Sequence, residues 1–281
     1  MRNMFVSDVR RLLRMRAFYV SLAALAAVIL LLAYGTWMNT QKDVSDLISM
    51  VGEETGQDLT AMEGPARAMS SMGMSPQMML RRQMTTRRLL TAPFKGRLPH
   101  LLISVLAALL IGKDIQSGYM KNLITLKGFR RHWYWSKLCV MVLAALLLYL
   151  SLFPFAYAGT WMLGNPVSLS MQEATPLLVG NFLASLAMIA LMMLVLMLLQ
   201  NRTAALVLGV LLPSGILTLV YKLIDLAGIL PFKLSGALLM EQVLLLGETG
   251  ITPQFLWTAF GVLACSLIGG RLLLEKQDLR L

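Results

Sequence analysis

The sequence predicts an all-α polytopic membrane protein in which residues 1–281 form a single transmembrane domain of six helices. Hydrophobic residues make up 57% of the chain and charged residues only 14%, whereas soluble domains carry about 25% charge. The mean hydropathy is +0.70, and apolar runs recur at about the 20-residue length that a spanning helix needs. The net charge of +11 then indicates cytoplasmic loops and contact with membrane lipids, and not nucleic-acid binding.

Five apolar runs have the length of a membrane-spanning helix. They are residues 17–38, 138–160, 176–199, 204–222 and 253–273. A sixth run, residues 98–111, would cover only about 21 Å at a rise of 1.5 Å per residue. We therefore expect this second span to begin near Leu89, with Lys95 and Arg97 reaching the headgroups or facing protein.

The basic residues of the short loops favour a cytoplasmic N-terminus and, with six spans, a cytoplasmic C-terminus. Residues 1–16 then form a cytoplasmic amphipathic segment and residues 113–137 a cytoplasmic loop, and each contains a single acid. The opposite side holds a long extracellular loop, 39–97, and the segment 225–252. The loop is rich in Met and Arg. We expect adaptable packing or substrate contact from its methionines, although thioethers also suit Cu(I).

Motifs for enzymatic chemistry are missing from the sequence. It contains no G-x-x-x-x-G-K-[ST] phosphate loop and no H-E-x-x-H zinc motif. Cys139 and Cys265 lie far apart, at or inside apolar runs, and indicate neither a disulfide nor a metal site. The middle thirds of the five clear spans lack acids, bases and histidines, which speaks against an ion-coupled carrier. We therefore expect no catalytic residue, metal or cofactor in this chain.

The first half of the 113–137 loop has the pattern of a contact surface for another protein. An acid follows the second span, a glycine offers a joint, and "MKNLITLKG" reads as a short amphipathic helix. Its apolar face could insert into a partner's groove between flanking lysines. The candidate contact residues are Asp114, Gly118, Tyr119, Lys121, Asn122, Leu123 and Lys127.

The second half of the loop has the composition of a membrane anchor at the inner headgroup level. The candidate anchor residues are Arg130, Arg131, Trp133, Tyr134, Trp135 and Lys137. An ordinary positive-inside loop with an aromatic belt would explain the composition of both halves equally well.

The order of residues in this loop resembles the first cytoplasmic loop of ABC-2-type permeases, the membrane subunits of one class of ABC exporters. There, an acid after the second span is followed by "G-x-x-K-N-L" and then by a basic "R-R/K-x-x-Y-x-x-S-K". The matching residues are Asp114, Gly118, Lys121, Asn122, Leu123, Arg130, Arg131, Tyr134, Ser136 and Lys137. The amphipathic N-terminus and the six spans are similar as well. The long first loop is similar to that of the lantibiotic-immunity and bacitracin-resistance subgroup.

The resemblance implies a bacterial cell-membrane permease that works with a separate ATPase subunit. ATP and Mg would be bound by that partner, which would press on the 113–127 segment as a coupling helix, assisted by residues 3–16. Two permease chains, as a homodimer or heterodimer, would export a hydrophobic or amphipathic substrate such as a peptide, an antibiotic or a lipid-like molecule. Resistance to antimicrobial peptides would follow from such export.

Between the last two predicted spans, residues 234–247 are too short to cross the membrane and too apolar to lie in water. Members of the resembling family have two short helices here that dip into the outer leaflet, so the resemblance implies a short re-entrant hairpin over residues 225–252. Glu241 would then be either a residue of the transport pathway or a structural hydrogen-bonding residue near the outer headgroups. Two other functions remain open: a membrane scaffold or sensor whose extracellular loop binds a ligand, and an ion-coupled carrier.

Overall fold

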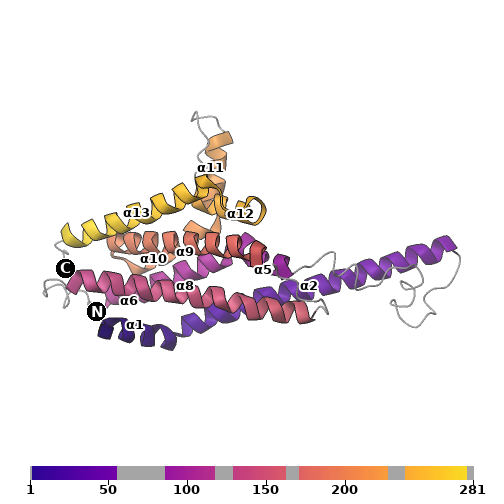
Figure 1. Ribbon diagram of the computed structural model, residues 1–281, viewed down its shortest axis with the longest axis horizontal. Helices are drawn as coiled ribbons and strands as arrows, with labels where there is room; N and C mark the ends of the chain where they lie inside the picture. Colours follow the sequence, from indigo (N-terminus) through magenta and orange to yellow (C-terminus); the bar gives the residue numbers. More distant parts are fainter. Residues whose placement is uncertain (1, 56–85, 118–128, 163–170, 227–237, 277–281) are drawn as a thin grey trace. The chain divides into compact units, whose positions relative to one another are not determined.

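The computed structural model describes residues 2–55, 86–117, 129–162, 171–226 and 238–276. This described part is helical and contains no β-strand (Figure 1). Its helices are α1 (Arg2–Arg14), α2 (Arg16–Thr55), α5 (Thr86–Lys95), α6 (Leu98–Gln116), α8 (Phe129–Met162), α9 (Met171–Leu199), α10 (Arg202–Ser214), α11 (Ile216–Leu226), α12 (Leu239–Thr249) and α13 (Pro253–Lys276).

Five stretches within these helices are long and apolar enough to cross a membrane, and α10 with α11 makes a sixth if the bent pair is one span. The five are Arg16–Gly35, Leu98–Gln116, His132–Met162, Ala174–Leu199 and Pro253–Leu274. The predicted class, an all-α protein with several membrane spans, is therefore confirmed. The side of the membrane on which each end lies stays a prediction.

The fifth predicted span is not the single straight helix that residues 204–222 suggested. α10 and α11 meet at an angle of 59°. The break lies at Gly215, which has the left-handed φ of +86° that favours glycine at a helix C-terminus. At the other end, the Asn201 side chain accepts hydrogen bonds from the backbone N–H groups of Thr203 and Ala204 and so begins α10.

The second span differs from the prediction at both of its ends. It does not begin near Leu89, because the chain breaks between α5 and α6 at Arg97, whose φ is +57°. α6 starts at Leu98 with Pro99 in its first turn, a position where proline is tolerated. It continues past Gly112 to Gln116 and so contains 19 residues, enough to span a membrane. The extra length is added at the C-terminal end of the apolar run, whereas the prediction added it at the N-terminal end.

Three predicted loop segments are partly helical. α2 runs through Gly35 to Thr55 and so occupies the first part of the predicted 39–97 loop. The 113–137 loop contributes its first residues to α6 and its last to α8, while 118–128 lie outside the described residues. Of the predicted 225–252 hairpin, the structure describes α12 and the end of α11; the hairpin itself stays a prediction.

The chain divides into two compact units. The smaller unit contains residues 24–93 and 152–171, and the larger contains residues 1–23, 94–151 and 172–281. In the smaller unit, a Cβ added at Gly159 of α8 would lie 3.4 Å from Ala33 of α2 and 3.4 Å from Leu89 of α5. Glycine thus allows these three helices to pack closely.

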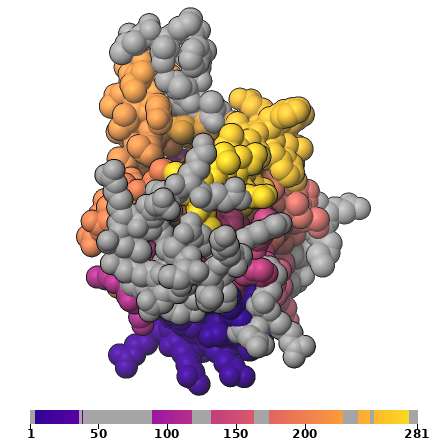
Figure 2. Space-filling view, turned by 90° about the vertical axis from the view of Figure 1, so that its left-hand side faces the viewer, coloured from indigo at the N-terminus to yellow at the C-terminus, as the bar shows by residue number. Residues whose placement is uncertain are grey.

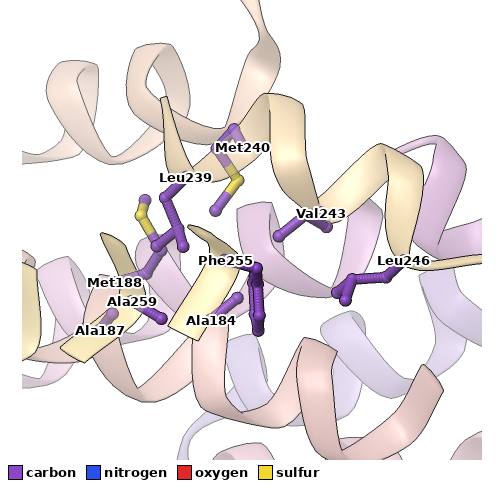
Figure 3. Packing of buried hydrophobic residues seen from close by; sticks show 9 residues of the cluster. All are labelled: Ala184, Ala187, Met188, Leu239, Met240, Val243, Leu246, Phe255 and Ala259. Atoms are coloured by element: carbon purple, nitrogen blue, oxygen red, sulfur yellow. The ribbon is translucent and has the colours of Figure 1, made fainter. Parts of the chain in front are cut away.

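In the larger unit, α12 packs against α9 and α13 through a buried apolar cluster (Figure 3). The cluster consists of Ala184, Ala187, Met188, Leu239, Met240, Val243, Leu246, Phe255 and Ala259. Phe255 of α13 lies beside Ala184 of α9. This packing gives α12, which has only 11 residues, a fixed place on the bundle.

α6 and α10 approach each other closely at two glycines. A Cβ added at Gly209 would lie 3.3 Å from the carbonyl oxygen of Ser104, and one at Gly112 would lie 2.8 Å from Cγ of Arg202. Small residues at such contacts bring helix backbones together within a membrane. The end of α6 and the beginning of α10 are therefore held at the same end of the larger unit.

α1, the last turn of α6, the first turns of α8 and the end of α13 also lie at this end (Figure 1). In the space-filling view of this end, α1 lies at one edge and α13 at another (Figure 2). The described residues on either side of 118–128, the end of α6 and the start of α8, therefore lie at this end.

Candidate functional site

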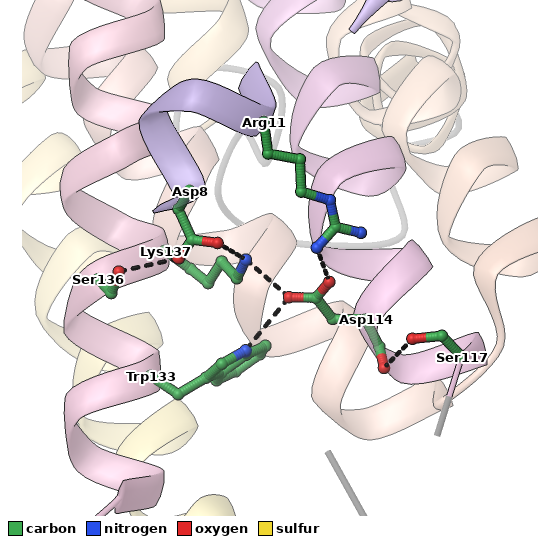
Figure 4. A network of polar contacts seen from close by, with 7 residues as sticks. All are labelled: Asp8, Arg11, Asp114, Ser117, Trp133, Ser136 and Lys137. Atoms are coloured by element: carbon green, nitrogen blue, oxygen red, sulfur yellow. Dashed lines mark hydrogen bonds and ion pairs between the residues drawn. The ribbon is translucent and has the colours of Figure 1, made fainter. Parts of the chain in front are cut away.

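A cluster of buried polar side chains joins α1, α6 and α8 at this end of the larger unit (Figure 4). We call it the ionic cluster. Its members are Asp8, Arg11, Asp114, Trp133, Ser136 and Lys137. The helical spacing explains how each element contributes, because residues three or four positions apart lie on the same face of a helix. Asp8 and Arg11 share one face of α1, and Trp133, Ser136 and Lys137 share one face of α8.

Lys137 is the centre of the ionic cluster. Its ammonium nitrogen lies 2.5 Å from Oδ1 of Asp8 and 2.6 Å from Oδ2 of Asp114. The Lys137 side chain is only 1% exposed, so water contributes little to its solvation. Two carboxylates from two other helices therefore compensate this buried charge.

Asp114 connects all three helices. One of its carboxylate oxygens accepts from Lys137 and, at 3.3 Å, from the indole N–H of Trp133; the other is ion-paired with Arg11. Its side chain is 1% exposed. Ser136 donates to Asp8 at 2.9 Å and completes the link from α8 to α1.

The ionic cluster contains two acids and two bases, so its charges balance. Desolvation of an ion can cost as much as its pairing gains, and for that reason a complete buried pair adds little stability. Removing one partner is costly, since it leaves an uncompensated charge in the protein interior. The ionic cluster therefore makes the relative positions of α1, α6 and α8 strongly dependent on one another.

The structure places the predicted contact residues in two groups. Asp114 is buried and touches α1 and α8, so it reaches a partner only through those elements. The others, Gly118 to Lys127, lie outside the described residues. The contact role of this segment stays a prediction.

The predicted anchor residues lie in the first turns of α8. Trp133 and Lys137 belong to the ionic cluster and point into the protein. Tyr134 is buried beside Gly270 of α13, where an added Cβ would lie 2.8 Å from the tyrosine oxygen. Trp135 packs edge-on against Tyr134 and is exposed, as a headgroup anchor would be. Arg130 and Arg131 are helical residues of α8.

Asp8, Arg11 and the link from Ser136 to α1 were missed by the sequence reasoning. A signal for them is present in the sequence. Asp8 is the one acid in residues 1–16, and Asp114 is the one acid in residues 113–137. Each single acid in a strongly basic segment pairs with Lys137.

A second group of charges lies where α6 begins. Glu241 of α12 is ion-paired with Lys222 of α11 at 2.5 Å and with Arg97 at 3.5 Å. Arg97 also donates to the hydroxyl of Thr218 at 3.4 Å. Glu241 therefore connects α12 to α11 and to the start of α6; its predicted place in a transport pathway stays a prediction.

Between the two charged groups, buried hydrogen bonds join α8 to α9. The Tyr149 hydroxyl donates to the carbonyl of Asn181 at 2.9 Å and lies 2.7 Å from Oγ of Ser185. Phe94 stacks on the Tyr149 ring with centroids 5.4 Å apart. In the described part of the chain, no three His, Cys, Asp or Glu side chains are grouped so that they could hold a metal ion.

The helices and the buried charges together define a multi-pass membrane protein whose charged groups lie toward the ends of its bundle. The family of ABC-2 family transporter proteins matches residues 65–225 of the chain. This match covers more than half of the sequence, and the chain belongs to the ABC-2 family. Searches of the curated proteins and of the solved structures found no significant match.

The family assignment confirms the resemblance found in the 113–137 loop. It identifies the chain as a membrane component of an ABC transporter, a class of permease that normally works with an ATPase subunit. The assignment does not reach the level of the lantibiotic-immunity and bacitracin-resistance subgroup.

Proposed function

We propose that the chain is the permease subunit of an ATP-driven exporter in a bacterial cell membrane. A separate ATPase subunit binds ATP and Mg and drives the movement. The substrate is a hydrophobic or amphipathic molecule, such as a peptide, an antibiotic or a lipid-like compound. Two permease chains, identical or different, form the pathway between them.

The observation that carries this proposal is the ionic cluster beside the 118–128 segment. In the sequence, the segment begins four residues after Asp114 and ends five residues before Trp133. Asp114 and Trp133 are hydrogen-bonded to each other, and Lys137 and Arg11 link both helices to α1. A force applied to the segment would therefore act on α1, α6 and α8 together.

The proposed energy input is a contact between the ATPase subunit and residues 113–127, with help from α1. Nucleotide-driven closure of the ATPase would shift this segment, and the ionic cluster would transmit the shift to the spans. A buried network of complementary charges suits this task because it favours defined arrangements of the helices over intermediate ones.

A reconstituted transport assay tests the proposal. The chain and its ATPase partner are placed in liposomes, and movement of a fluorescent amphipathic peptide is followed with ATP or with an imposed ion gradient. We expect movement that requires ATP and Mg. Movement driven by a proton or sodium gradient without ATP would identify a carrier, and binding to the extracellular loop without movement would identify a sensor.

Charge reversal at Lys121 and Lys127 tests the proposed contact. The double variant should lose ATP-driven movement and association with the ATPase, because both lysines flank the apolar face of the predicted coupling helix. The control is Lys95→Glu, which changes an exposed basic residue of α5, outside the elements at the end where the predicted contact lies. Equal losses in the two proteins would remove the contact from residues 113–127.

A further inference from the structure

Arg97 is held in an unusual backbone conformation at the start of α6. Its φ of +57° is rare for a residue with a side chain. This conformation separates α5 from α6 and directs the guanidinium into the protein, where its side chain is only 10% exposed. Outliers of this kind are concentrated at functional sites, where the surrounding structure maintains them.

The guanidinium of Arg97 lies directly against the break between α10 and α11. A Cβ added at Gly215 would overlap with Nη1 of Arg97. The break ends α10 at Ser214, and the carbonyl end of a helix carries a partial negative charge. The partial negative charge of that helix end stabilises the guanidinium in this place.

The polar side-chain contacts of Arg97 are long. Its two side-chain partners, Thr218 and Glu241, lie at 3.4 Å and 3.5 Å, whereas charge-assisted hydrogen bonds measure about 2.7–2.9 Å. Among the described residues, the buried Oε2 of Glu241 has no hydrogen-bond partner. An arginine has five N–H donors, so Arg97 retains capacity for a closer anion.

Lys222 is the member of this charged group that is exposed at the protein surface. Its side chain is 56% exposed, and its ammonium lies 2.5 Å from Oε1 of Glu241. Arg97 and Lys222 thus face the two oxygens of one carboxylate from two sides. Arg97, Lys222 and Glu241 alone carry a net charge of +1, and Asp225, three positions after Lys222 on the same face of α11, adds a second acid.

Two exposed apolar side chains flank Lys222 on α11. Leu219 and Leu226, three positions before and four positions after it, share its face of α11. They are 63% and 87% exposed. A free inorganic ion would leave these side chains uncovered, while a molecule with an anionic head and an apolar tail would cover them and meet Lys222.

We propose that Arg97 and Lys222 bind the phosphate group of an anionic phospholipid from the membrane, whose acyl chains lie along Leu219 and Leu226. Glu241 holds the two cations when the lipid is absent and competes with the phosphate. The planar guanidinium of Arg97 would bind the phosphate oxygens in a fixed geometry, whereas the ammonium of Lys222 would follow the phosphate on a flexible side chain. This inference concerns binding alone and does not require that the lipid be transported.

Native mass spectrometry of the full chain in a neutral detergent tests the site. The probes are phosphatidylglycerol, which is anionic, and phosphatidylcholine, which is zwitterionic, each titrated into delipidated protein. We expect phosphatidylglycerol to bind more tightly than phosphatidylcholine. Arg97→Gln should weaken phosphatidylglycerol binding by roughly tenfold, the equivalent of about 1.4 kcal/mol.

Lys222→Gln and Glu241→Gln should act in opposite directions. The first removes a cation and should weaken binding, while the second removes the competing acid and should strengthen it. The control is Lys95→Gln, which removes an exposed cation two residues from Arg97 and should change little. Thermal unfolding shows whether each variant keeps its fold. If Arg97→Gln does not fold, the site is tested by whether Lys222→Gln and Glu241→Gln shift the lipid affinity in opposite directions.

Three results would overturn the proposal. The first is equal binding of the two lipids to the unmodified protein. The second is a loss in Lys95→Gln as large as the losses at the site, because it would show that surface charge alone attracts the lipid. The third is a shift in the same direction, or no shift, for Lys222→Gln and Glu241→Gln.

Discussion

Replacing Lys137 with methionine tests whether the ionic cluster holds α1, α6 and α8 together. Methionine keeps much of the length of the side chain and removes its charge. Lys137 lies 2.5 Å from Asp8 and 2.6 Å from Asp114, and its side chain is 1% exposed. The variant leaves the two acids with Arg11 alone, so the neutral cluster acquires a net charge of −1.

Breaking a buried ion pair on one side costs about 3–5 kcal/mol. For a chain of this length, each kcal/mol lowers the melting temperature by roughly 2 °C or more. We therefore expect Lys137→Met to melt at least about 6 °C below the unmodified protein. The measurement is thermal unfolding in detergent, followed by the change in tryptophan fluorescence as the buried Trp133 becomes exposed.

A double variant separates the charge balance from the loss of the lysine itself. Asp8→Asn combined with Lys137→Met leaves Arg11 and Asp114, one base and one acid. It should therefore be more stable than the sum of the two single changes predicts, with a coupling of about 0.5–3 kcal/mol. The control is Lys113→Gln, an exposed cation beside Asp114. A loss in Lys137→Met no larger than in Lys113→Gln would refute the structural role of the ionic cluster.

Three further predictions concern the packing of the larger unit, and thermal unfolding checks each one. Gly112→Ala should cost about 1–3 kcal/mol, because its Cβ would lie 2.8 Å from a side chain of α10; Gly261→Ala, with nothing within 4 Å, should be neutral or slightly stabilising, and equal effects would contradict the close approach. Gly215→Ala should cost more than Gly250→Ala: both residues have positive φ, but only at Gly215 would the new atom overlap with a guanidinium. Tyr149→Phe should cost about 1–3 kcal/mol by removing a hydroxyl that makes two buried hydrogen bonds, and an unchanged melting temperature would show that these bonds add nothing.

The class of the protein could be predicted from the sequence because apolar runs of membrane length are a strong and local signal. The ends of the spans were less predictable. The run 204–222 contains Pro213 and Gly215, both breakers of helices, yet its apolar character alone suggested a straight span. The predicted start of the second span near Leu89 was wrong because the helix is interrupted at Arg97. No pattern in the neighbouring sequence indicates the left-handed conformation of this residue.

The ionic cluster was only partly predictable. The loop pattern singled out Asp114 and Lys137, and the single acid in residues 1–16 was visible in the sequence. Their pairing was not, since Asp8 and Lys137 are 129 positions apart and only the packing of three helices brings them together. Glu241 was singled out as an acid in an apolar segment, while its two cations, Arg97 and Lys222, come from elements distant in the sequence.

Purification of the chain from its native membrane in a mild detergent tests the central claim most directly. We expect a second protein that carries a G-x-x-x-x-G-K-[ST] phosphate loop to co-purify in a fixed ratio, and the complex to hydrolyse ATP in the presence of Mg. The account would be contradicted if no nucleotide-binding protein accompanied the chain while an ion gradient still drove movement of its substrate.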